Sequence, residues 1–242
     1  MTYQLNSVVV TSPPPSAPAP TILRGKYITL EPLTNDGALF ERLYDVSHGD
    51  VTREKVWYFL PYGSFASAKE MRCHYVELSS GKDPMFYAVR HHDDEQVAGI
   101  VSYLRIQPAA RSIEIGHIWH ATARQRGRAN TEAVFLLIKN AFALGYRRLE
   151  WKCNALNVRS RQAALRLGLA FEGVFRQCTV VKGKNRDTAW FALLDVDWLV
   201  AQQNMEQWLE APLGEISLTE CNLPLVKWSL PAHDAWAVSK TV

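Results

Sequence analysis

The chain has 242 residues, of which 48% are hydrophobic, 21% charged and 11% aromatic. This composition fits one folded domain with additional chain at its ends and excludes a disordered protein. The net charge is only +3 and no apolar run approaches the roughly 18 residues that cross a bilayer, so neither a nucleic acid nor a membrane is the expected partner.

The first 22 residues differ from the rest of the chain. Residues 11–20 read TSPPPSAPAP and hold five of the twelve prolines. Because proline fixes φ and lacks an amide donor, we expect residues 1–22 to form a disordered or polyproline-like tail. No basic leader or long apolar region is present at the N-terminus, so a targeting signal is not predicted. The four cysteines show no metal-like spacing, which indicates reduced thiols, a cytoplasmic protein and no bound metal.

Hydrophobic periodicity and turn residues predict an alternation of strands and helices after this tail. Strands are predicted at 27–30, 85–90, 97–106, 112–121, 147–153, 170–181 and 187–194. Helices are predicted at 36–46, 67–78, 128–144, 157–167 and 197–209. This order predicts a mixed α/β sheet with flanking helices. The chain beyond residue 211 has no clear period but is apolar, and we expect it to cover a hydrophobic face of the domain or a partner subunit, which would make a homodimer.

The segment 124–133 links a predicted strand to a strongly amphipathic helix. Gly127 and Ala129 are small where the loop turns into the helix, which lets a ligand approach the backbone closely. The first turn of a helix has free N–H groups and the positive end of the helix dipole, so it attracts anions. Three arginines surround this point, namely Arg124, Arg126 and Arg128. A diphosphate suits these charges, and the alternative is a solvated basic helix start.

This arginine-x-x-glycine-x-alanine run resembles the acetyl-CoA loop of the GCN5-related N-acetyltransferases (GNAT). The stretches GHIWHATARQRGRANTEA, LEWKCNALNVRSRQAALRLGLAFEGVFR and NRDTAWFALL are similar to the branch that contains the ribosomal-protein N-terminal acetyltransferases. The resemblance covers roughly residues 23–200 and implies a central, mostly antiparallel sheet that is splayed at the cofactor cleft. Residues 201–242 then form a helix end and a C-terminal extension.

The resemblance also implies which residues meet acetyl-CoA. Backbone amides of the loop would hold the pyrophosphate, Asn157 the pantetheine arm, and Arg161 the nucleotide phosphates. Asn157 and Ser160 are also residue types that cap helices, and the two roles can coexist. The cofactor-binding residues implied in this way are Ile118, Trp119, Arg124, Arg126, Gly127, Arg128, Ala129, Asn130, Asn157, Ser160 and Arg161.

One position departs from the family pattern. The tyrosine that protonates the leaving thiolate in many members falls at Ala164, which has no polar side-chain atom. The role then passes to Ser160, to water or to no group. A thiol with a pKa of about 8.5, by analogy with cysteine, leaves tolerably as the thiolate without help.

The predicted strand 112–120 supplies the candidates for the general base, and the resemblance makes it one wall of the cleft, with backbone amides that polarise the acetyl carbonyl. Strand alternation divides these residues between two faces. One face carries Glu114, Gly116, Ile118 and His120, and the opposite face carries Ile115, His117 and Trp119. Glu114 is the first candidate, unless it is a surface carboxylate paired with Arg105 or Arg111. His120 is the second because it titrates near neutrality, unless it is structural.

Two further segments border the cleft by resemblance. Trp57, Tyr58 and Phe59 are expected as exposed aromatic residues beside the acceptor pocket, or as a loop clamped onto the core. Residues 185–187 lie at a hairpin near the cleft, or form a turn ion pair of little energetic value.

The sequence therefore predicts an N-acetyltransferase that transfers an acetyl group directly from acetyl-CoA to a primary amine. The acceptor is a peptide or protein N-terminus or a small molecule. Deprotonation at pH 7 costs about 1 kcal/mol for an α-amine and roughly 4–5 kcal/mol for a lysine-like amine, so a single carboxylate serves the α-amine more easily. The alternative is a catalytically silent acyl-CoA-binding or scaffolding protein, which Ala164 and the two terminal segments favour; a nucleic-acid-binding module ranks third.

Overall fold

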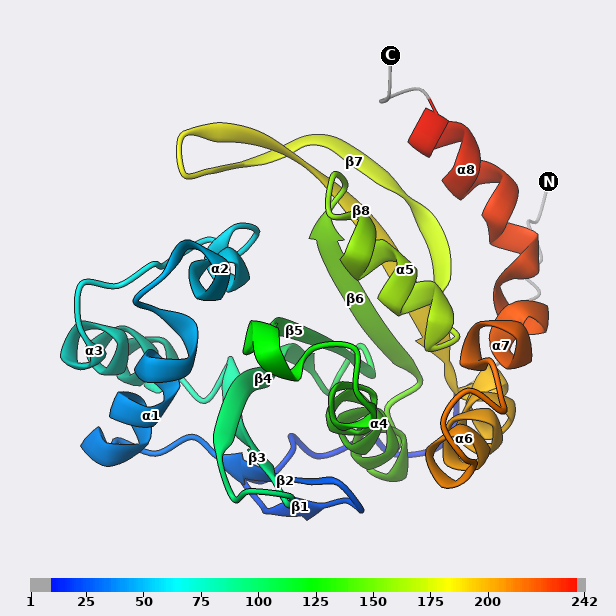
Figure 1. Ribbon diagram of the computed structural model, residues 1–242. Coiled ribbons are helices and arrows are strands. Elements are labelled where there is room, and N and C mark those ends of the chain that lie inside the picture. The colour runs from blue at the N-terminus through cyan, green and yellow to red at the C-terminus, as the bar shows by residue number, and fades with distance from the viewer. Residues whose placement is uncertain (1–9, 239–242) are drawn as a thin grey trace, which may run out of the picture.

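One eight-stranded sheet runs through the computed structural model, which describes residues 10–238 (Figure 1). The strands are β1 (Leu23–Arg24), β2 (Ile28–Pro32), β3 (Met85–His91), β4 (Val97–Gln107), β5 (Ser112–His120), β6 (Arg148–Asn154), β7 (Ala170–Val181) and β8 (Lys184–Leu194). Their order in the sheet is β1-β2-β3-β4-β5-β6-β8-β7. All neighbouring strands are antiparallel except β5 and β6, which are parallel. The predicted mixed α/β fold is confirmed.

Helices cover both faces of this sheet. The α-helices are α1 (Gly37–Ser47), α2 (Val51–Glu54), α3 (Ala68–Ser79), α4 (Arg128–Ala143), α5 (Val158–Arg166), α6 (Asp195–Glu210), α7 (Leu218–Val226) and α8 (Leu230–Val238), and the 3₁₀ helices are η1 (Lys55–Trp57), η2 (Thr122–Arg124) and η3 (Lys227–Ser229). The starts follow from sequence: Asp36, Ser67 and Ser217 each accept a backbone N–H with the side chain at a helix N-terminus. Within the described residues, no helix is both long and apolar enough to span a bilayer.

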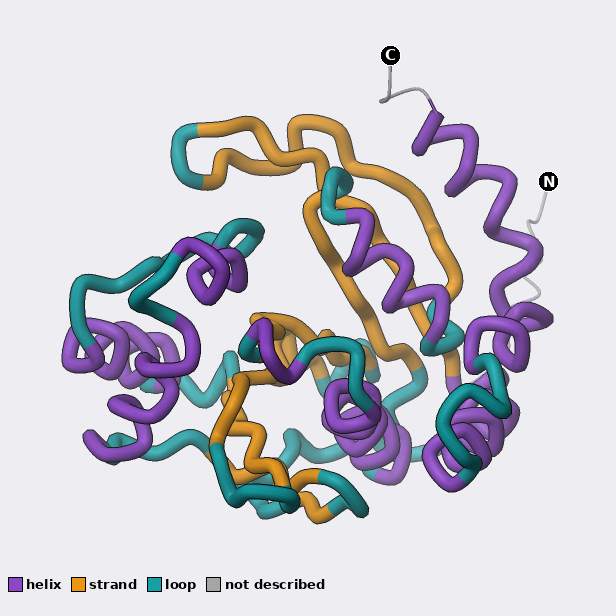
Figure 2. Tube along the Cα trace, in the orientation of Figure 1, coloured by secondary structure: helices purple, strands orange, loops and turns teal. Residues whose placement is uncertain are grey.

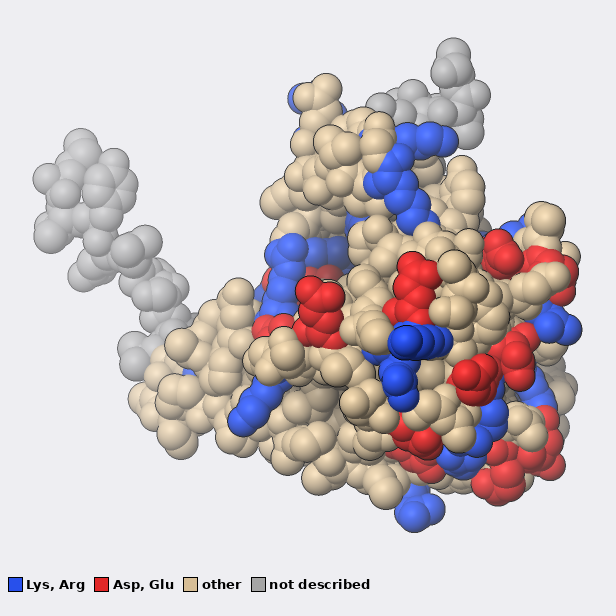
Figure 3. Space-filling model, turned by 90° about the vertical axis from the view of Figure 1, so that its left-hand side faces the viewer, with Lys and Arg blue, Asp and Glu red and all other residues tan. Residues whose placement is uncertain are grey.

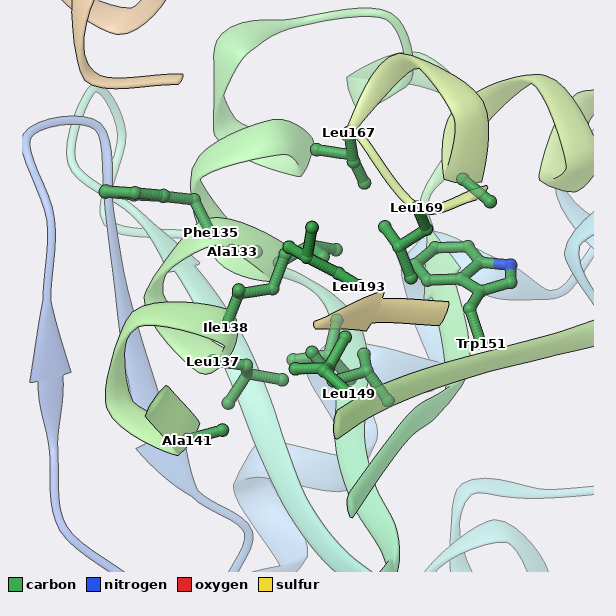
Figure 4. Packing of buried hydrophobic residues seen from close by; sticks show 14 of the residues in the cluster. Ala133, Phe135, Leu137, Ile138, Ala141, Leu149, Trp151, Leu167, Leu169 and Leu193 are labelled. Carbon is green, nitrogen blue, oxygen red and sulfur yellow. The ribbon is translucent and has the colours of Figure 1, made fainter. Parts of the chain in front are cut away.

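The larger hydrophobic core lies between one face of the sheet and α4, α5 and α6. Figure 4 shows α4 pointing Leu137 and Ile138 toward Leu149 of β6 and Leu193 of β8, and these four side chains are 0–1% exposed. The smaller core lies between α1, α3 and the opposite face of β3, β4 and β5. The sheet is therefore held from both sides, and β5 carries apolar residues into both cores.

The parallel pair β5–β6 separates part-way along its length. Pairing joins Ser112–Ile115 of β5 to Arg148–Trp151 of β6 and then stops, although β5 continues to His120 and β6 to Asn154. We call this opening the fork. Because α4 follows β5 and α5 follows β6, both helices begin at the open end of the fork.

The terminal segments differ from expectation in part. Residues 10–22 pack on the domain, since Pro15 and Pro18 are buried and the Tyr87 hydroxyl donates to the Ala19 carbonyl at 3.4 Å. The expected disorder is therefore wrong for this part of the tail, because apolar proline rings can pack without backbone pairing. Residues 1–9 lie outside the described residues.

The C-terminal extension forms α7, η3 and α8, which pack against α5, α6 and β7. In this packing, the Phe171 amide donates to Ser229 Oγ at 3.1 Å, and the His233 ring contacts the rings of Phe171 and Phe191. The extension thus covers a hydrophobic face of its own domain, as one of the two alternatives had it. The homodimer stays a prediction.

Candidate active site

The N-terminus of α4 is open at the fork. Gly127 precedes the helix and no side chain caps it, so the first amides of α4 have no acceptor within the helix. A Cβ added at Gly127 would meet nothing within 4 Å, and Asn130 Oδ1 is buried without a hydrogen bond among the described residues. Free donors and open space fit the diphosphate end of coenzyme A, whereas Asn130 Oδ1 is an acceptor and does not attract an anion.

The three arginines around this helix start are not equivalent. Arg126 is exposed, with a left-handed φ of 68°. Arg124 instead pairs with Asp93 at 2.7 Å and with Asp94. The Arg128 guanidinium donates to the Tyr27 hydroxyl at 2.8 Å and to two carbonyls at the end of α6, those of Leu209 and Ala211. Arg128 therefore ties α4 to α6, so the expectation of three arginines facing a diphosphate is corrected to Arg126 alone.

The start of α5 forms the other side of the fork's open end. Asn157 Oδ1 accepts the Ser160 amide at 3.2 Å and caps the helix. Ser160 Oγ accepts the Trp151 indole N–H at 3.0 Å, and the Ser160 hydroxyl also hydrogen-bonds the Cys153 side chain. Trp151 is the last β6 residue paired with β5, so this serine lies beside the point where the fork opens. Ala164 is fully buried in the larger core.

Arg161 is in a different place from the one the resemblance implied. It is 5% exposed, and its guanidinium contacts His233 Nε2 at 2.9 and 3.2 Å and the Ala155 carbonyl at 3.2 Å. The Trp236 ring lies 4.7 Å from it. Its expected availability to the nucleotide phosphates is therefore wrong. The reason is α8, whose helical packing had no periodic signal in the sequence.

A β-bulge interrupts β5 at the fork. Ser102 of β4 pairs with Gly116 and Ile100 pairs with Trp119, so between these pairs one residue on β4 opposes two on β5, and His117 has a φ of +50°. Beyond Gly116 the predicted alternation is therefore wrong. Trp119 continues the face of Glu114 into the smaller core, whereas Ile118 packs against the larger core.

His120 is consequently separated from Glu114 by the sheet. Its side chain is buried, and neither ring nitrogen has a hydrogen bond with a described residue. Burial lowers the pKa of His120 to about 3, so the ring is neutral near pH 7. These surroundings are those of a core histidine, the structural alternative considered for it.

Glu114 lies at the closed end of the fork, in the last part of β5 that is still paired with β6, within a charged cluster. Its side chain is 7% exposed, and Oε2 lies 2.8 Å from Lys152 Nζ and 3.4 Å from Arg105 Nε. Burial raises the pKa of Glu114, while Lys152 and Arg105 oppose that rise. A Cβ added to Gly116 would lie 3.7 Å from Glu114 Oε1, so the missing side chain leaves this oxygen open toward the fork.

Sequence reasoning found the Arg105 pairing as an alternative but missed Lys152. Lys152 Nζ also pairs with Glu150 at 2.9 Å and lies 3.7 Å from the centre of the Trp190 ring. The signal was available, because charged and apolar residues alternate along residues 148–153 in a predicted strand, which the structure places inside the sheet between β5 and β8. That pattern predicts a charged face on a central strand.

Aromatic side chains line the side of the cleft opposite β6. His117 Nδ1 lies 2.9 Å from the Tyr62 hydroxyl, which accepts from Tyr75 at 3.3 Å, and Trp119 Nε1 donates to Tyr75 at 3.0 Å. Burial lowers the pKa of His117 to about 4. Trp57 is buried in the same cluster. Its expected exposure is therefore wrong, and the alternative, a loop packed onto the core, holds for this residue.

The end of the β7–β8 hairpin reaches across this side of the molecule (Figure 2). At its turn, Lys182 Nζ donates to the Trp57 carbonyl at 2.8 Å, which joins the hairpin to η1. We call residues 175–187 the arm. Tyr58 is 72% exposed beside this contact, so of the three expected aromatic residues it is the one that faces solvent most. The cleft is therefore bounded by the fork, the aromatic cluster and the arm.

Comparison with known proteins identifies the family. The model of an acetyltransferase (GNAT) domain matches residues 28–170, which include β2–β6, α4 and α5. The chain belongs to the GNAT family.

Two solved GNAT structures resemble it over most of its length. A GCN5-related N-acetyltransferase from Brucella melitensis is 38% identical with a TM-score of 0.82, covering 88% of this chain and 98% of the other. A probable acetyltransferase from Chromobacterium violaceum ATCC 12472 is 36% identical with a TM-score of 0.74, covering 82% and 98%.

The name of one curated relative states its acceptor. The ribosomal-protein-serine acetyltransferase of Escherichia coli (strain K12) is 30% identical over 100 residues, which are 41% of this chain and 55% of that protein. The match thus spans about half the length of this relative. The domain match shows the GNAT family. It does not specify the acceptor of this protein.

Proposed function

We propose that this GNAT protein is an N-acetyltransferase that uses acetyl-CoA to acetylate a primary amine of a peptide or protein. The fork is the observation that carries the proposal. Two adjacent strands separate after four residue pairs, with an uncapped helix start at the open end and a buried carboxylate at the closed end. This arrangement gives a slot for a thioester between the strands, an anion site for its diphosphate and a base for the amine.

The residues that would hold the diphosphate are the backbone amides of Gly127, Arg128, Ala129 and Asn130, with Arg126 as the nearby cation. Asn157 and the strand residues Ile118 and Trp119 would border the pantetheine arm and the acetyl group. The end of pairing with β6 supports this assignment, because β5 beyond Ile115 has no partner on that side and its backbone groups there are unpaired toward the fork. Such amides are suited to polarising the acetyl carbonyl. The bulge at His117 bends the strand at the same place.

The chemistry requires one proton to leave the amine and one to reach the sulfur. The amine nitrogen forms a bond to the acetyl carbon and the carbon–sulfur bond breaks. Glu114 accepts the amine proton, through water because the carboxylate is buried and paired with Lys152. The Ser160 hydroxyl, which also hydrogen-bonds the Cys153 side chain, would protonate the leaving thiolate in the absence of a tyrosine at residue 164.

The acceptor is assigned to peptide or protein amines for two reasons. A single carboxylate suffices for an α-amine, whose deprotonation at pH 7 costs about 1 kcal/mol, but not for a lysine-like amine, which costs roughly 4–5 kcal/mol. The curated relative is described as acting on a ribosomal protein serine, which supports a polypeptide acceptor for this chain.

Thiol release from acetyl-CoA, measured against a panel of short peptides, small amines and amino sugars, tests the proposal. We expect acetyl-CoA alone to raise the Tm and at least one peptide to release coenzyme A in step with its own acetylation. Binding of acetyl-CoA without turnover on any amine would favour the catalytically silent alternative. No rise in Tm at millimolar acetyl-CoA would remove the cofactor assignment itself.

A further inference from the structure

One face of β8 carries three buried polar atoms without partners. Arg186 Nε, Thr188 Oγ1 and Trp190 Nε1 each make no hydrogen bond with a described residue, and Thr188 is only 4% exposed. Since alternate residues of a strand share a face, the three side chains form one column. The column spans about 13 Å at roughly 3.3 Å per residue, which is the length of several residues of an extended peptide.

This column faces the proposed active site. Ala189 and Phe191, the residues on either side of Trp190, lie in the larger core, so the column occupies the opposite face of the sheet. At its inner end the Trp190 ring lies 3.7 Å from Lys152 Nζ, which is paired with Glu114. At its outer end the column runs past the last β6 residue that is paired with β5, because Thr188 lies opposite Asn154, the final residue of β6, and Arg186 lies two residues further along β8.

The chemistry of the column selects its ligand. The guanidinium and indole groups can only donate hydrogen bonds, and the hydroxyl can donate as well as accept. Buried donors without partners lower the stability of a fold, and a bound ligand with acceptor groups would satisfy these three. Carboxylate and carbonyl oxygens are the matching groups, whereas a polyamine would place further cations beside Arg186.

The arm extends the same preference outward. It carries four basic residues against one acidic residue, Arg176, Lys182, Lys184 and Arg186 against Asp187. The lobe at the top of Figure 3, where the hairpin end projects, shows Lys and Arg side chains and no Asp or Glu. The charged groups at the base of the cleft compensate one another, because Lys152 and Arg105 contact Glu114. The net field along the path from the solvent to the fork is therefore positive.

We propose that the acceptor is a peptide N-terminus followed by acidic residues, which lies along the Arg186–Thr188–Trp190 column beneath the arm. This inference rests on the proposed acetyltransferase function and specifies its substrate. The α-amine would reach Glu114 at the inner end, while carboxylate and carbonyl oxygens of the following residues would accept hydrogen bonds from the column.

Three amidated peptides with the same first residue test this specificity, one continuing with aspartates, one with asparagines and one with lysines. We expect kcat/KM for the aspartate peptide to exceed that for the lysine peptide by at least tenfold at low salt, and the ratio to shrink as salt is added. Arg186→Gln should lower kcat/KM for the aspartate peptide about tenfold, the size expected for one charge-assisted hydrogen bond. Thr188→Val, which removes the hydroxyl without changing the shape, should lower it several-fold.

The matched control is Lys227→Gln, because Lys227 is an exposed cation on η3 in the C-terminal extension. It should leave all three rates unchanged, and all three variants should keep the rise in Tm with acetyl-CoA. Equal rates on the acidic and basic peptides, or a preference that survives Arg186→Gln, would overturn the inference while leaving the acetyltransferase proposal standing. Failure of every amine to release thiol would remove both.

Discussion

Glu114 combines a catalytic candidate's position with a structural pairing. A buried carboxylate that loses its charge leaves its cationic partner unpaired, so substitutions here affect both chemistry and stability. The contact with Lys152 at 2.8 Å has a further effect, since it holds the carboxylate beside the fork in one orientation. Lys152 is in this sense a positioning residue for the proposed base.

Substitution Glu114→Gln tests the base directly. We expect kcat to fall by about 10²-fold or more, the contribution typical of a general base, while the rise in Tm with acetyl-CoA remains. The measurement is thiol release under saturating acetyl-CoA, with Glu150→Gln as the control because Glu150 also contacts Lys152 but is paired with Arg148. Equal losses in the two variants would assign the effect to Lys152 and not to proton transfer.

His120 gives a prediction on the pH dependence of stability. Its pKa is lowered to about 3 in the folded protein against an ordinary value near 6.5, so the unfolded chain binds a proton that the folded chain does not. The stabilising contribution is present above pH 6.5 and is lost as the pH falls toward 3. At pH 5 the loss amounts to about 2 kcal/mol.

Urea denaturation at pH 7 and pH 5 measures this effect. His120→Gln should reduce the difference in unfolding free energy between the two pH values by about 2 kcal/mol. His92→Gln, at an exposed histidine, should leave the difference as it is in the wild type. An unchanged difference in His120→Gln would mean that the ring is not kept neutral by burial.

At the scale of elements, the start of α4 is the decisive feature for the cofactor. Gly127 has an ordinary φ of −91°, and a Cβ there would meet nothing within 4 Å. The fold itself therefore does not require glycine here, but a cofactor in the open space would. Gly127→Trp should fill that space and abolish the rise in Tm with acetyl-CoA. Gly81→Trp is the control, since a Cβ there also meets nothing closer than 3.9 Å. A retained rise in Gly127→Trp would place the diphosphate elsewhere.

The elements that sequence reasoning predicted well are those whose signals are local. The apolar period of residues 128–144 matches α4, and the glycine turn before it matches the helix start. The errors came from features that depend on a partner element. The bulge at His117 is defined by the register against β4, and the burial of Arg161 depends on α8. Neither partner can be read from the residues concerned.

The candidate site divides in the same way. Gly127 and Asn157 could be selected because they fit the family motifs, and Glu114 because it is a carboxylate on the predicted strand that the resemblance makes one wall of the cleft. Lys152 and the Arg186–Thr188–Trp190 column could not, because their meaning comes from orientation toward a cleft that is formed by three separate elements. A charged residue in a strand indicates a polar surface, but the sequence does not state whether that surface meets solvent or substrate.

At the scale of the whole molecule, the C-terminal extension makes α5 part of the core. His233 links Arg161 to the rings of Phe171 and Phe191, so α8 and β7 enclose the helix that carries Ser160. His233→Ala should lower the unfolding free energy by about 2 kcal/mol, from the lost hydrogen bonds to a buried guanidinium and the lost ring packing.

Chemical denaturation at pH 7 checks this value. Trp228→Ala is the comparison, because Trp228 belongs to the same extension but is 70% exposed; its effect should stay within about 0.5 kcal/mol. Equal effects of the two substitutions would show that the extension is not anchored through His233.

The fork also has a mechanical meaning. Four residue pairs join β1–β5 to β6–β8 within the sheet, and the contact between Lys182 and Trp57 forms a second tie far from them. In the proposed complex, acetyl-CoA lies between these two parts of the sheet, where β5 and β6 are not paired. The bound cofactor would then connect the two parts at a further place, so its binding free energy adds to the stability of the folded sheet.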